Sequence, residues 1–323
     1  MSTGNNPKIL VFGAGSVGTL YLYLLSKVAS VTAVCRSNYE IVKKDGFIIN
    51  STIFGENIHF TPNVVKTCTE AAQHGPFDYI VVCSKAIPNM VPEVIQPAVT
   101  LNHTAIVLIQ NGIGIEEEYV NMFPGSPIVS GVAYLPVTQR PAGVINHKEV
   151  ERLELGNYPA SSKNGHAATF AKLVQDSGAT AELYDDVQSK RWTKLLVNAS
   201  WNPLCALTLC TDVEFIKSSS FATDFVRSTM LEVADIANAW GHGITKDQVE
   251  HQLGRAVARV ETNKGIEPSM LQDAKEGRTM EFEAIVGNVV RLGKEKGVKC
   301  EKLETLYILG TALNAQVGLR PKK

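Results

Sequence analysis

The fold of this chain follows from one stretch near its N-terminus, Lys8-Ile9-Leu10-Val11-Phe12-Gly13-Ala14-Gly15-Ser16-Val17-Gly18. Its first five residues predict a buried strand, and a G-x-G-x-x-G motif follows at once and opens a predicted helix. In that context Gly13 allows a tight turn, Gly15 lets the backbone approach a pyrophosphate, and Gly18 permits close packing of the helix on the strand. The free N–H groups of the helix N-terminus suit phosphates. The stretch predicts a dinucleotide-binding unit; the alternative is a glycine-rich turn without a ligand.

Strand and helix patterns alternate through the first half of the chain. Besides the strand 8–12, nearly continuous apolar runs predict strands at 31–34, 77–83 and 104–109, and residues 19–28 read as a helix. Such alternation is typical of βαβ units and a parallel sheet. Over 127–156 the strand-like runs are separated by Gly, Pro and Asn, which predicts a sheet extension that closes the first domain.

The second half of the chain has helical spacing instead. We expect helices over the ranges 185–209, 221–240, 245–260, 281–296 and 303–316. The predicted fold is therefore α/β, with a Rossmann-like N-terminal domain over 1–183 and an all-helical C-terminal domain over 184–323.

Composition excludes several classes of protein. The chain has 323 residues and a formal net charge of -1, so it lacks the basic balance of a nucleic-acid or membrane-surface protein. No apolar run approaches the roughly 20 residues of a membrane span. The six cysteines are scattered, the short polar N-terminus does not resemble a signal peptide, and a cytoplasmic location is expected. The seven histidines are dispersed, so no metal site is expected.

The end of the second predicted strand indicates which nucleotide is bound. An NAD-type fold carries Asp or Glu there, but this chain has Cys35-Arg36-Ser37-Asn38, and Glu40 is the next carboxylate. The guanidinium of Arg36 could pair with a 2′-phosphate. NADPH is therefore favoured as cofactor, the alternative being that Arg36 is a solvated surface charge.

A polar stripe marks the first helix of the second half. Lys194, Asn198 and Asn202 are spaced i, i+4, i+8 and share one helix face among apolar neighbours. Buried polar groups need partners, so the stripe is a candidate site; a half-exposed polar face is the alternative. Pro203 is expected to kink or end this helix.

A second polar cluster starts with Pro268-Ser269-Met270-Leu271-Gln272-Asp273, where Pro-Ser before an apolar pair predicts a helix start. Glu281 then falls in the first turn of the next helix. A carboxylate is favoured there by the helix dipole alone.

Together these blocks resemble the ketopantoate reductase (2-dehydropantoate 2-reductase) family over nearly the whole chain. The resemblance rests on the glycine motif, on Cys83-Ser84-Lys85, on Gln110-Asn111-Gly112-Ile113-Gly114, and on Lys194-Leu195-Leu196-Val197-Asn198 with Asn202-Pro203-Leu204. It includes Ser269-Met270-Leu271-Gln272-Asp273 and Glu281. The last two blocks, in this order and spacing, are specific, whereas many dehydrogenases share the glycine motif.

The resemblance implies roles for matching positions. Lys194 is implied to be the catalytic lysine that donates to the substrate carbonyl, and Glu281 to contact both that lysine and the hydroxyl end of the substrate. Substrate hydrogen bonds are implied for Asn198, Asn202, Ser269 and Asn111. Cofactor contacts are implied for Gly13, Ala14, Gly15, Ser16, Val17, Gly18, Arg36, Lys85 and Asn111.

The implied reaction is the NADPH-dependent reduction of 2-dehydropantoate to (R)-pantoate, at a site between the two domains. Hydride transfer leaves negative charge on the substrate oxygen, and a positioned ammonium stabilises that charge. One alternative is another branched or aromatic 2-oxo acid, because the pair of serines common before Met270 in the family is Pro268-Ser269 here.

Two further alternatives are a β-hydroxyacid dehydrogenase of the 6-phosphogluconate type and a non-catalytic NADPH-binding sensor. The Asn-Pro-Leu and Ser-Met-Leu-Gln-Asp blocks disfavour the first, and the presence of both Lys194 and Glu281 disfavours the second. The expected partner is a small 2-oxo acid, and a possible homodimer is left open.

Overall fold

A computed structural model describes residues 6–319 and divides the chain into two compact units. The first unit runs to Gln110 and resumes over Ile115–Val187. The second unit comprises Asn111–Gly114 and the chain from Gln188 onward. The division therefore lies four residues after the predicted boundary at 183, and a short segment of the first half belongs to the helical unit, which the sequence did not indicate.

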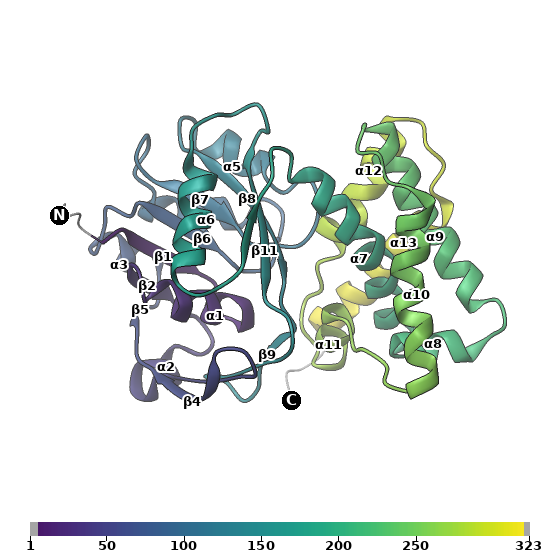
Figure 1. The fold of residues 1–323 in the computed structure, drawn as a ribbon, viewed down its shortest axis with the longest axis horizontal. Helices are drawn as coiled ribbons and strands as arrows, with labels where there is room; N and C mark the ends of the chain where they lie inside the picture. The colour runs from purple at the N-terminus through teal and green to yellow at the C-terminus, as the bar shows by residue number, and fades with distance from the viewer. Residues whose placement is uncertain (1–5, 320–323) are drawn as a thin grey trace. The chain divides into compact units, whose positions relative to one another are not determined.

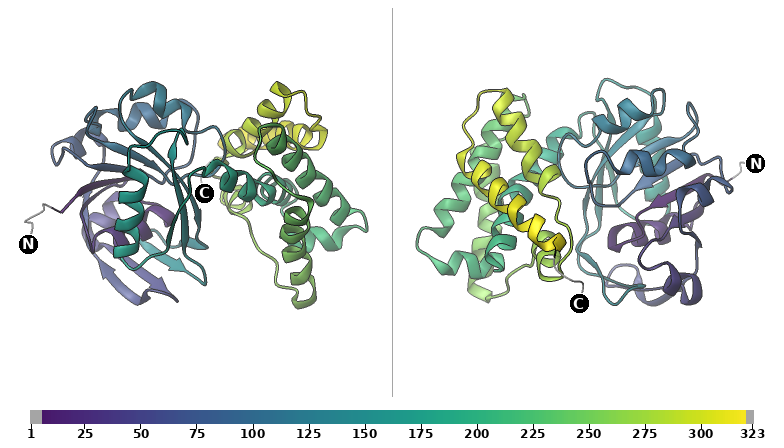
Figure 2. Two further views of the ribbon diagram at one scale, coloured as in Figure 1. Left: turned by 45° about the horizontal axis from the view of Figure 1, so that its top comes forward. Right: turned by 180° about the vertical axis from the view of Figure 1, so that it is seen from behind.

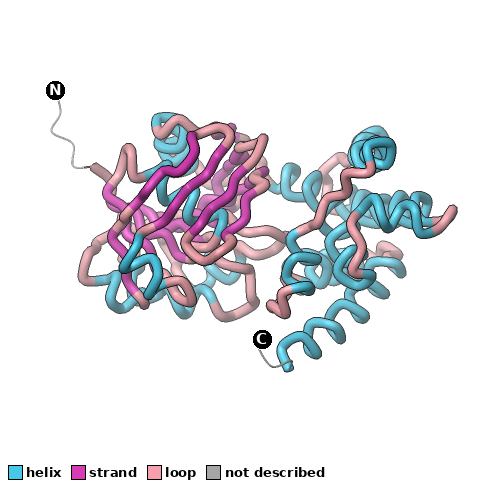
Figure 3. The backbone as a smooth tube through the Cα atoms, turned by 90° about the horizontal axis from the view of Figure 1, so that it is seen from below, coloured by secondary structure: helices cyan, strands magenta, loops and turns pink. Residues whose placement is uncertain are grey.

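The first unit is built on an eight-stranded sheet of order β12-β11-β8-β7-β6-β1-β2-β5 (Figures 1 and 3). Neighbouring strands are parallel except for the antiparallel pair β8 and β11. The four residues of β6 and of β7 are all buried, as expected for strands covered on both faces. The strands are β1 (Lys8–Phe12), β2 (Ser30–Val34), β5 (Asn63–Val65), β6 (Tyr79–Val82), β7 (Ala105–Leu108), β8 (Ile128–Tyr134), β11 (Arg152–Tyr158) and β12 (Ala181–Leu183).

The strand order reverses beside β1. The chain runs outward from β1 through β2 to β5, then returns to β6 on the other side of β1 and continues to β7 and β8. Right-handed crossovers then place helices on both faces of the sheet. Ligands in such sheets bind beyond the carboxyl ends of the strands at the reversal. The helices are α1 (Ser16–Leu25), α2 (Tyr39–Asp45), α3 (Cys68–Ala72), α4 (Val91–Ile95), η1 (Gln96–Ala98), α5 (Glu117–Met122) and α6 (His166–Asp176).

A second, four-stranded sheet also belongs to this unit, with order β4-β3-β10-β9. Its strands are β3 (Phe47–Ser51), β4 (Gly55–Phe60), β9 (Val137–Gln139) and β10 (Val144–His147). The predicted sheet extension over 127–156 is therefore correct for β8 and β11 but wrong for β9 and β10. The local sequence of a short strand does not indicate which strand it pairs with. Here β10 pairs with β3, which lies about a hundred residues earlier in the chain.

Helices alone form the second unit over residues 188–319 (Figures 2 and 3). The long helix α7 (Gln188–Thr208) contacts α9, α11 and α13 and carries much of the core. All five predicted helices are present. The other elements are α8 (Asp212–Ser218), α9 (Ala222–Ala239), α10 (Lys246–Thr262), α11 (Ser269–Lys275), the π-helical η2 (Glu283–Gly287), α12 (Asn288–Glu295) and α13 (Glu301–Leu319).

The sequence predicted that Pro203 would kink or end this helix. Helix α7 does not end at Pro203 but continues to Thr208. Proline inside a helix removes one hydrogen bond and costs about 3 kcal/mol. Leu204, Cys205 and Ala206 are buried in the core by that continuation. Burial of the leucine side chain contributes about 1.5–3 kcal/mol, and the burial of the other two residues adds to it, so that packing together offsets the local cost of the proline.

Two helical glycines allow a matched test of this packing. The ring of Phe282 occupies the place that a Cβ on Gly310 would take, whereas a Cβ on Gly254 would meet nothing within 4 Å. Alanine gains about 1 kcal/mol of helix propensity at either position, but overpacking costs about 1–3 kcal/mol. We expect Gly254→Ala to raise and Gly310→Ala to lower the free energy of unfolding in denaturant titrations. Equal shifts in the two variants would contradict the packing of Phe282 on α13.

Candidate functional site

The glycine turn between β1 and α1 has the geometry of a phosphate-binding loop. Gly13 has φ +94°, and a Cβ there would lie 2.5 Å from the Ser84 backbone nitrogen beyond β6. A Cβ on Gly18 would collide with the Gly13 carbonyl oxygen. Around Gly15, by contrast, nothing lies within 4 Å of the Cβ position, and no side chain caps the helix that it opens. Two glycines are therefore required by packing, and the third leaves open space at a helix N-terminus.

The Ala14 carbonyl oxygen in this turn is held by three side chains. It accepts hydrogen bonds from Asn38 Nδ2 at 2.8 Å, Thr19 Oγ1 at 3.2 Å and Gln139 Nε2 at 3.3 Å. Asn38 is buried and also donates to Gln139 Oε1 at 3.1 Å. Gln139 belongs to β9, so the small sheet braces the turn. Sequence reasoning missed both amides, because nothing in the local pattern indicates their common partner.

Arg36 lies two residues after the end of β2. Because β2 is parallel to β1 and pairs with it, Arg36 lies at the edge of the sheet where the glycine turn begins. Its side chain is exposed, and within residues 6–319 its guanidinium makes no ion pair or side-chain hydrogen bond. Glu40, the carboxylate nearest in sequence, forms an ion pair of 2.7 Å with Lys66. Lys85 follows β6 at the same edge and is half-buried. The exposed guanidinium of Arg36 thus leaves positive charge available at this edge of the sheet.

Two cysteines adjoin this turn as neutral packing groups. Burial raises the pKa of the Cys35 thiol to about 12, and burial also raises the pKa of the Cys83 thiol well above its usual value. Both are therefore protonated at neutral pH, where a thiolate would be the reactive form. They contribute apolar contacts and no negative charge to a site suited to phosphates.

In the helical unit, Lys194 on α7 donates from Nζ to Asn111 Oδ1 at 2.8 Å. Asn111 follows β7 in sequence but belongs to this unit together with Gly112, Ile113 and Gly114. The sequence placed both residues among the candidates without indicating that they touch. The hydrogen bond fixes the direction of one N–H of the ammonium, which suits a proton donor.

Asn198 and Asn202 continue the stripe of Lys194 along α7, one and two turns further. Asn198 is half-buried, and Asn202 is only 4% exposed. Within the described residues neither side chain makes a hydrogen bond to another group of the protein. A nearly buried amide without a partner is costly, so these two groups are suited to a polar ligand.

Ser269 and Glu281 lie at the starts of two segments that both contact α7. Ser269 is the exposed first residue of α11, after the N-cap Pro268, so the predicted helix start is confirmed. Glu281 is half-buried and precedes the helical run that begins with η2; its carbonyl accepts from Ile285 N at 3.1 Å. The packing of α11 and η2 on α7 gathers these residues around the helix of Lys194.

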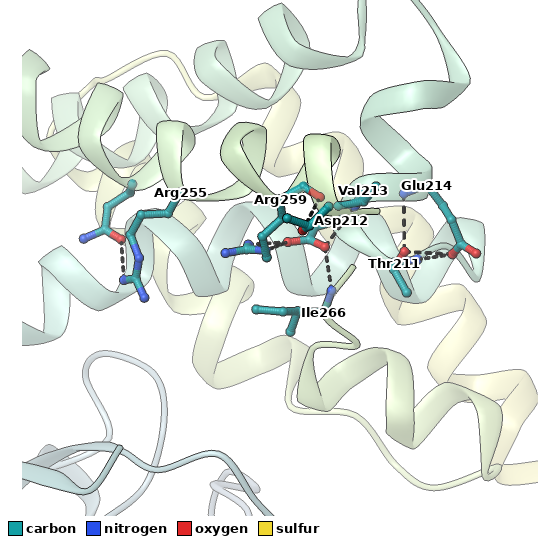
Figure 4. A network of polar contacts seen from close by, with 9 residues as sticks. Thr211, Asp212, Val213, Glu214, Arg255, Arg259 and Ile266 are labelled. Carbon is teal, nitrogen blue, oxygen red and sulfur yellow. Dashed lines mark hydrogen bonds and ion pairs between the residues drawn. The ribbon is translucent and has the colours of Figure 1, made fainter. Parts of the chain in front are cut away.

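A buried carboxylate holds the loop that leads to Ser269 (Figure 4). Asp212 forms an ion pair with Arg259 of α10 and accepts from Ile266 N at 2.7 Å and Val213 N at 2.9 Å. Thr211 and Glu214 form a capping box at the start of α8. The loop after α10 is thereby tied to α8 before it reaches α11.

Comparison with known proteins matches both parts of the chain to one family. Residues 9–160 match the family model described as "Ketopantoate reductase PanE/ApbA", and residues 186–314 match "Ketopantoate reductase PanE/ApbA C terminal". The two matches fall on the sheet unit and the helical unit.

Individual relatives align over almost the full length. A crystal structure of 2-dehydropantoate 2-reductase from Methylococcus capsulatus is 33% identical, with a TM-score of 0.83 over 96% of this chain and 98% of that chain. The 2-dehydropantoate 2-reductase of Nostoc sp. is 29% identical over 94% of each chain. A structure titled as D-mandelate dehydrogenase with NADH and anilino(oxo)acetate has a TM-score of 0.84 at 22% identity, covering 97% of this chain and all of that one, so this likeness shows the fold alone.

Over residues 6–319, none of the helices is long and apolar enough to cross a membrane. The homodimer stays a prediction.

The glycine turn provides a test that separates ligand contact from folding. Gly15 has φ -80°, which alanine adopts freely, and its surroundings are open. We expect Gly15→Ala to lower the free energy of unfolding by less than about 1 kcal/mol but to weaken NADPH binding at least about tenfold. Gly18→Ala should instead lower Tm, because the new methyl group meets the Gly13 carbonyl. Fluorescence titration measures the NADPH affinity of both variants, and thermal melts measure their stability. Wild-type affinity for NADPH in Gly15→Ala would exclude the glycine turn as the phosphate-binding site.

Proposed function

Because the chain belongs to the ketopantoate reductase family, we propose that it catalyses the NADPH-dependent reduction of 2-dehydropantoate to (R)-pantoate, a step toward pantothenate. The observation that carries this proposal is the 2.8 Å hydrogen bond from Lys194 to Asn111, on the helix face that also bears Asn198 and Asn202. It places an oriented cation and two unpartnered amides along one stripe of a buried helix.

In the proposed reaction the bound nicotinamide supplies a hydride to C2 of the 2-oxo acid. The carbonyl oxygen gains negative charge as the C–H bond forms, and the ammonium of Lys194 stabilises that charge and transfers its proton to the oxygen. Asn111 accepts one N–H of the ammonium and thereby sets the direction of the others. The products are the 2-hydroxy acid, the oxidised nicotinamide cofactor and a neutral lysine, and the lysine regains its proton from solvent.

The remaining site residues are proposed to hold the substrate. Asn198 and Asn202 offer amide donors and acceptors that no protein group of the described chain uses. Ser269 is assigned to the substrate carboxylate, and Glu281 to its hydroxyl end. These roles match groups that 2-dehydropantoate carries, namely a carboxylate, a ketone and a primary alcohol.

NADPH is proposed as the cofactor because the residues of the first unit fit its phosphates. The open space at Gly15 and the uncapped start of α1 suit the pyrophosphate, and Arg36 suits the 2′-phosphate. Lys85 adds positive charge at the same edge. A relative of this fold was solved with NADH, so the preference depends on Arg36 rather than on the fold.

A second substrate class is favoured by one observation. The D-mandelate dehydrogenase structure shares the fold over nearly the whole chain, and its title names an aryl-substituted oxo acid. Reduction of another branched or aromatic 2-oxo acid by the same Lys194 chemistry is therefore the alternative.

A substrate panel decides between these two classes. We expect NADPH oxidation with 2-dehydropantoate to show a kcat/KM at least about a hundredfold above that with branched or aromatic 2-oxo acids. An acid that lacks the hydroxyl of 2-dehydropantoate would leave buried polar groups of the site unpaired. A higher kcat/KM for an aromatic acid would establish the alternative. No turnover with any of them would favour a non-catalytic NADPH-binding protein.

Removal of the ammonium tests the chemistry. Lys194→Ala is expected to lower kcat at least about a hundredfold while leaving the Kd for NADPH unchanged, because the loss of a proton donor typically costs 10²–10⁴-fold. Steady-state kinetics and NADPH fluorescence measure the two quantities. Lys217→Ala, which removes an exposed lysine paired with Asn263, is the matched control. Normal turnover by Lys194→Ala would exclude this lysine from the mechanism.

Reversal of the charge at position 36 tests which of the two nucleotides, NADPH or NADH, the protein prefers. We expect Arg36→Asp to raise the Kd for NADPH much more than that for NADH, since a carboxylate repels the 2′-phosphate but accepts from a 2′-hydroxyl. The ratio of the two Kd values should change by at least about tenfold, or about 1.4 kcal/mol. An unchanged ratio would exclude Arg36 as the anchor of the 2′-phosphate.

A further inference from the structure

Besides the contact of Asn111 with Lys194, the segment Asn111–Gly114 is held on the helices of the second unit by hydrogen bonds to its backbone. Arg191 Nη1 donates to Gly112 O at 3.1 Å, and Ile113 N donates to Ala284 O at 3.1 Å. Asn288 Nδ2 donates to Ile113 O at 2.6 Å. The Ile113 side chain is buried in the core of this unit. The segment is therefore attached through its backbone at two consecutive residues, next to the one that contacts Lys194.

The π-helical element η2 supplies one of these attachment points. Asn288 N donates to Glu283 O, five residues back, rather than to Ala284 O, four residues back. The Ala284 carbonyl is therefore directed to Ile113 N. π-helical turns within helices occur often at functional sites, and this one contacts the candidate site directly.

Close contact leaves no freedom at Gly112. Its φ is +105°, which L side chains rarely adopt, and a Cβ there would collide with Ala284. The backbone on either side of the Arg191 contact is thus set by van der Waals contact as well as by hydrogen bonds. The backbone position of the neighbouring Asn111 is therefore restricted as well.

Arg191 is the charged member of this attachment, and it lies on the catalytic helix itself. It is 2% exposed and precedes Lys194 by three residues, so both side chains leave the same face of α7. A buried guanidinium needs hydrogen-bond acceptors, and the Gly112 carbonyl is one of them. Its contact with the Gly112 carbonyl places it one residue from Asn111.

We propose that Arg191 is a positioning residue for the reaction: by holding the Gly112 carbonyl, it sets the place of Asn111 and, through Asn111, the direction of the Lys194 ammonium. The inference rests on the proposed function, because it assigns the proton donor to Lys194. Arg191 itself touches no reacting atom in this scheme. Its effect should therefore fall on kcat and should require Asn111.

The test is a double-mutant cycle between Arg191→Met and Asn111→Ala, assayed with 2-dehydropantoate and NADPH. Each single variant is expected to lower kcat by about a hundredfold, the order of loss for a misplacement of about 1 Å. In Arg191→Met, which leaves Asn111 in place, KM and the Kd for NADPH should stay within about threefold of wild type. Because both changes act through one hydrogen bond, the double variant should lose no more than about threefold beyond Asn111→Ala. Arg191→Lys, which keeps a donor, should recover at least part of kcat.

A second measurement needs no turnover. Hydrogen exchange of the Ile113 amide should become at least tenfold faster in Arg191→Met and in Asn288→Ala, while amides of α9 and α10 keep their protection. Asn288→Ala removes the hydrogen bond to the Ile113 carbonyl and leaves the buried guanidinium of Arg191 in place. It therefore tests the attachment of the same segment even if Arg191→Met does not fold. Arg227→Met, which removes a half-buried arginine paired with Asp224 and Glu250, is the control and should leave exchange and kcat unchanged.

The possible results separate the two hypotheses. Independent losses, multiplying to about ten-thousandfold in the double variant, would overturn the positioning role while leaving the proposed reaction intact. Unchanged exchange of the Ile113 amide in both single variants would also overturn it. Absence of turnover by the wild-type protein with every 2-oxo acid would overturn the proposed function, and the catalytic role of Arg191 with it.

Discussion

The sheet unit depends on a close approach of backbone to backbone at the end of β1. Gly18 lies so near the Gly13 carbonyl oxygen that a single methyl group would not fit, and Gly13 lies equally near the chain that leaves β6. This contact joins α1 to β1 and β6 at the point where the strand order reverses. Open space remains at Gly15, where α1 begins without a side-chain cap. The same constraint thus builds the core and leaves the space in which we propose that the phosphates of the cofactor bind.

The helical unit meets a different constraint, namely that α7 carries polar groups through an apolar core. Arg191, Lys194, Asn198 and Asn202 lie on a helix whose other buried residues are mostly apolar. The segment from Asn111 to Gly114 supplies partners for the first two, an amide oxygen for the lysine and a carbonyl for the arginine. The two asparagines have no partner in the described protein. The polar side chains at one end of the stripe thus have partners within the protein, and the two amides at the other end have none among the described residues.

Each unit also braces its candidate site from elements far away in sequence. Gln139, on a strand of the small sheet, supports Ala14 in the glycine turn. Asp212 ties the loop before Ser269 to α8 and α10. In both cases a polar side chain, half-buried for Gln139 and buried for Asp212, holds backbone close to a predicted binding residue. Such contacts limit the positions of the residues that face a ligand.

The sequence by itself determined the strand β1, the glycine turn, the helical second half and the identity of the candidate residues. These follow from local rules: apolar runs, glycine spacing and the i, i+4 periodicity of a helix. Only the tertiary structure decided that Asn111 belongs with Lys194, that β9 and β10 form a separate sheet, and that α7 continues past Pro203. Each of these depends on a contact between distant residues or on burial in a shared core, whose free energy exceeds the local preferences that a sequence pattern reports.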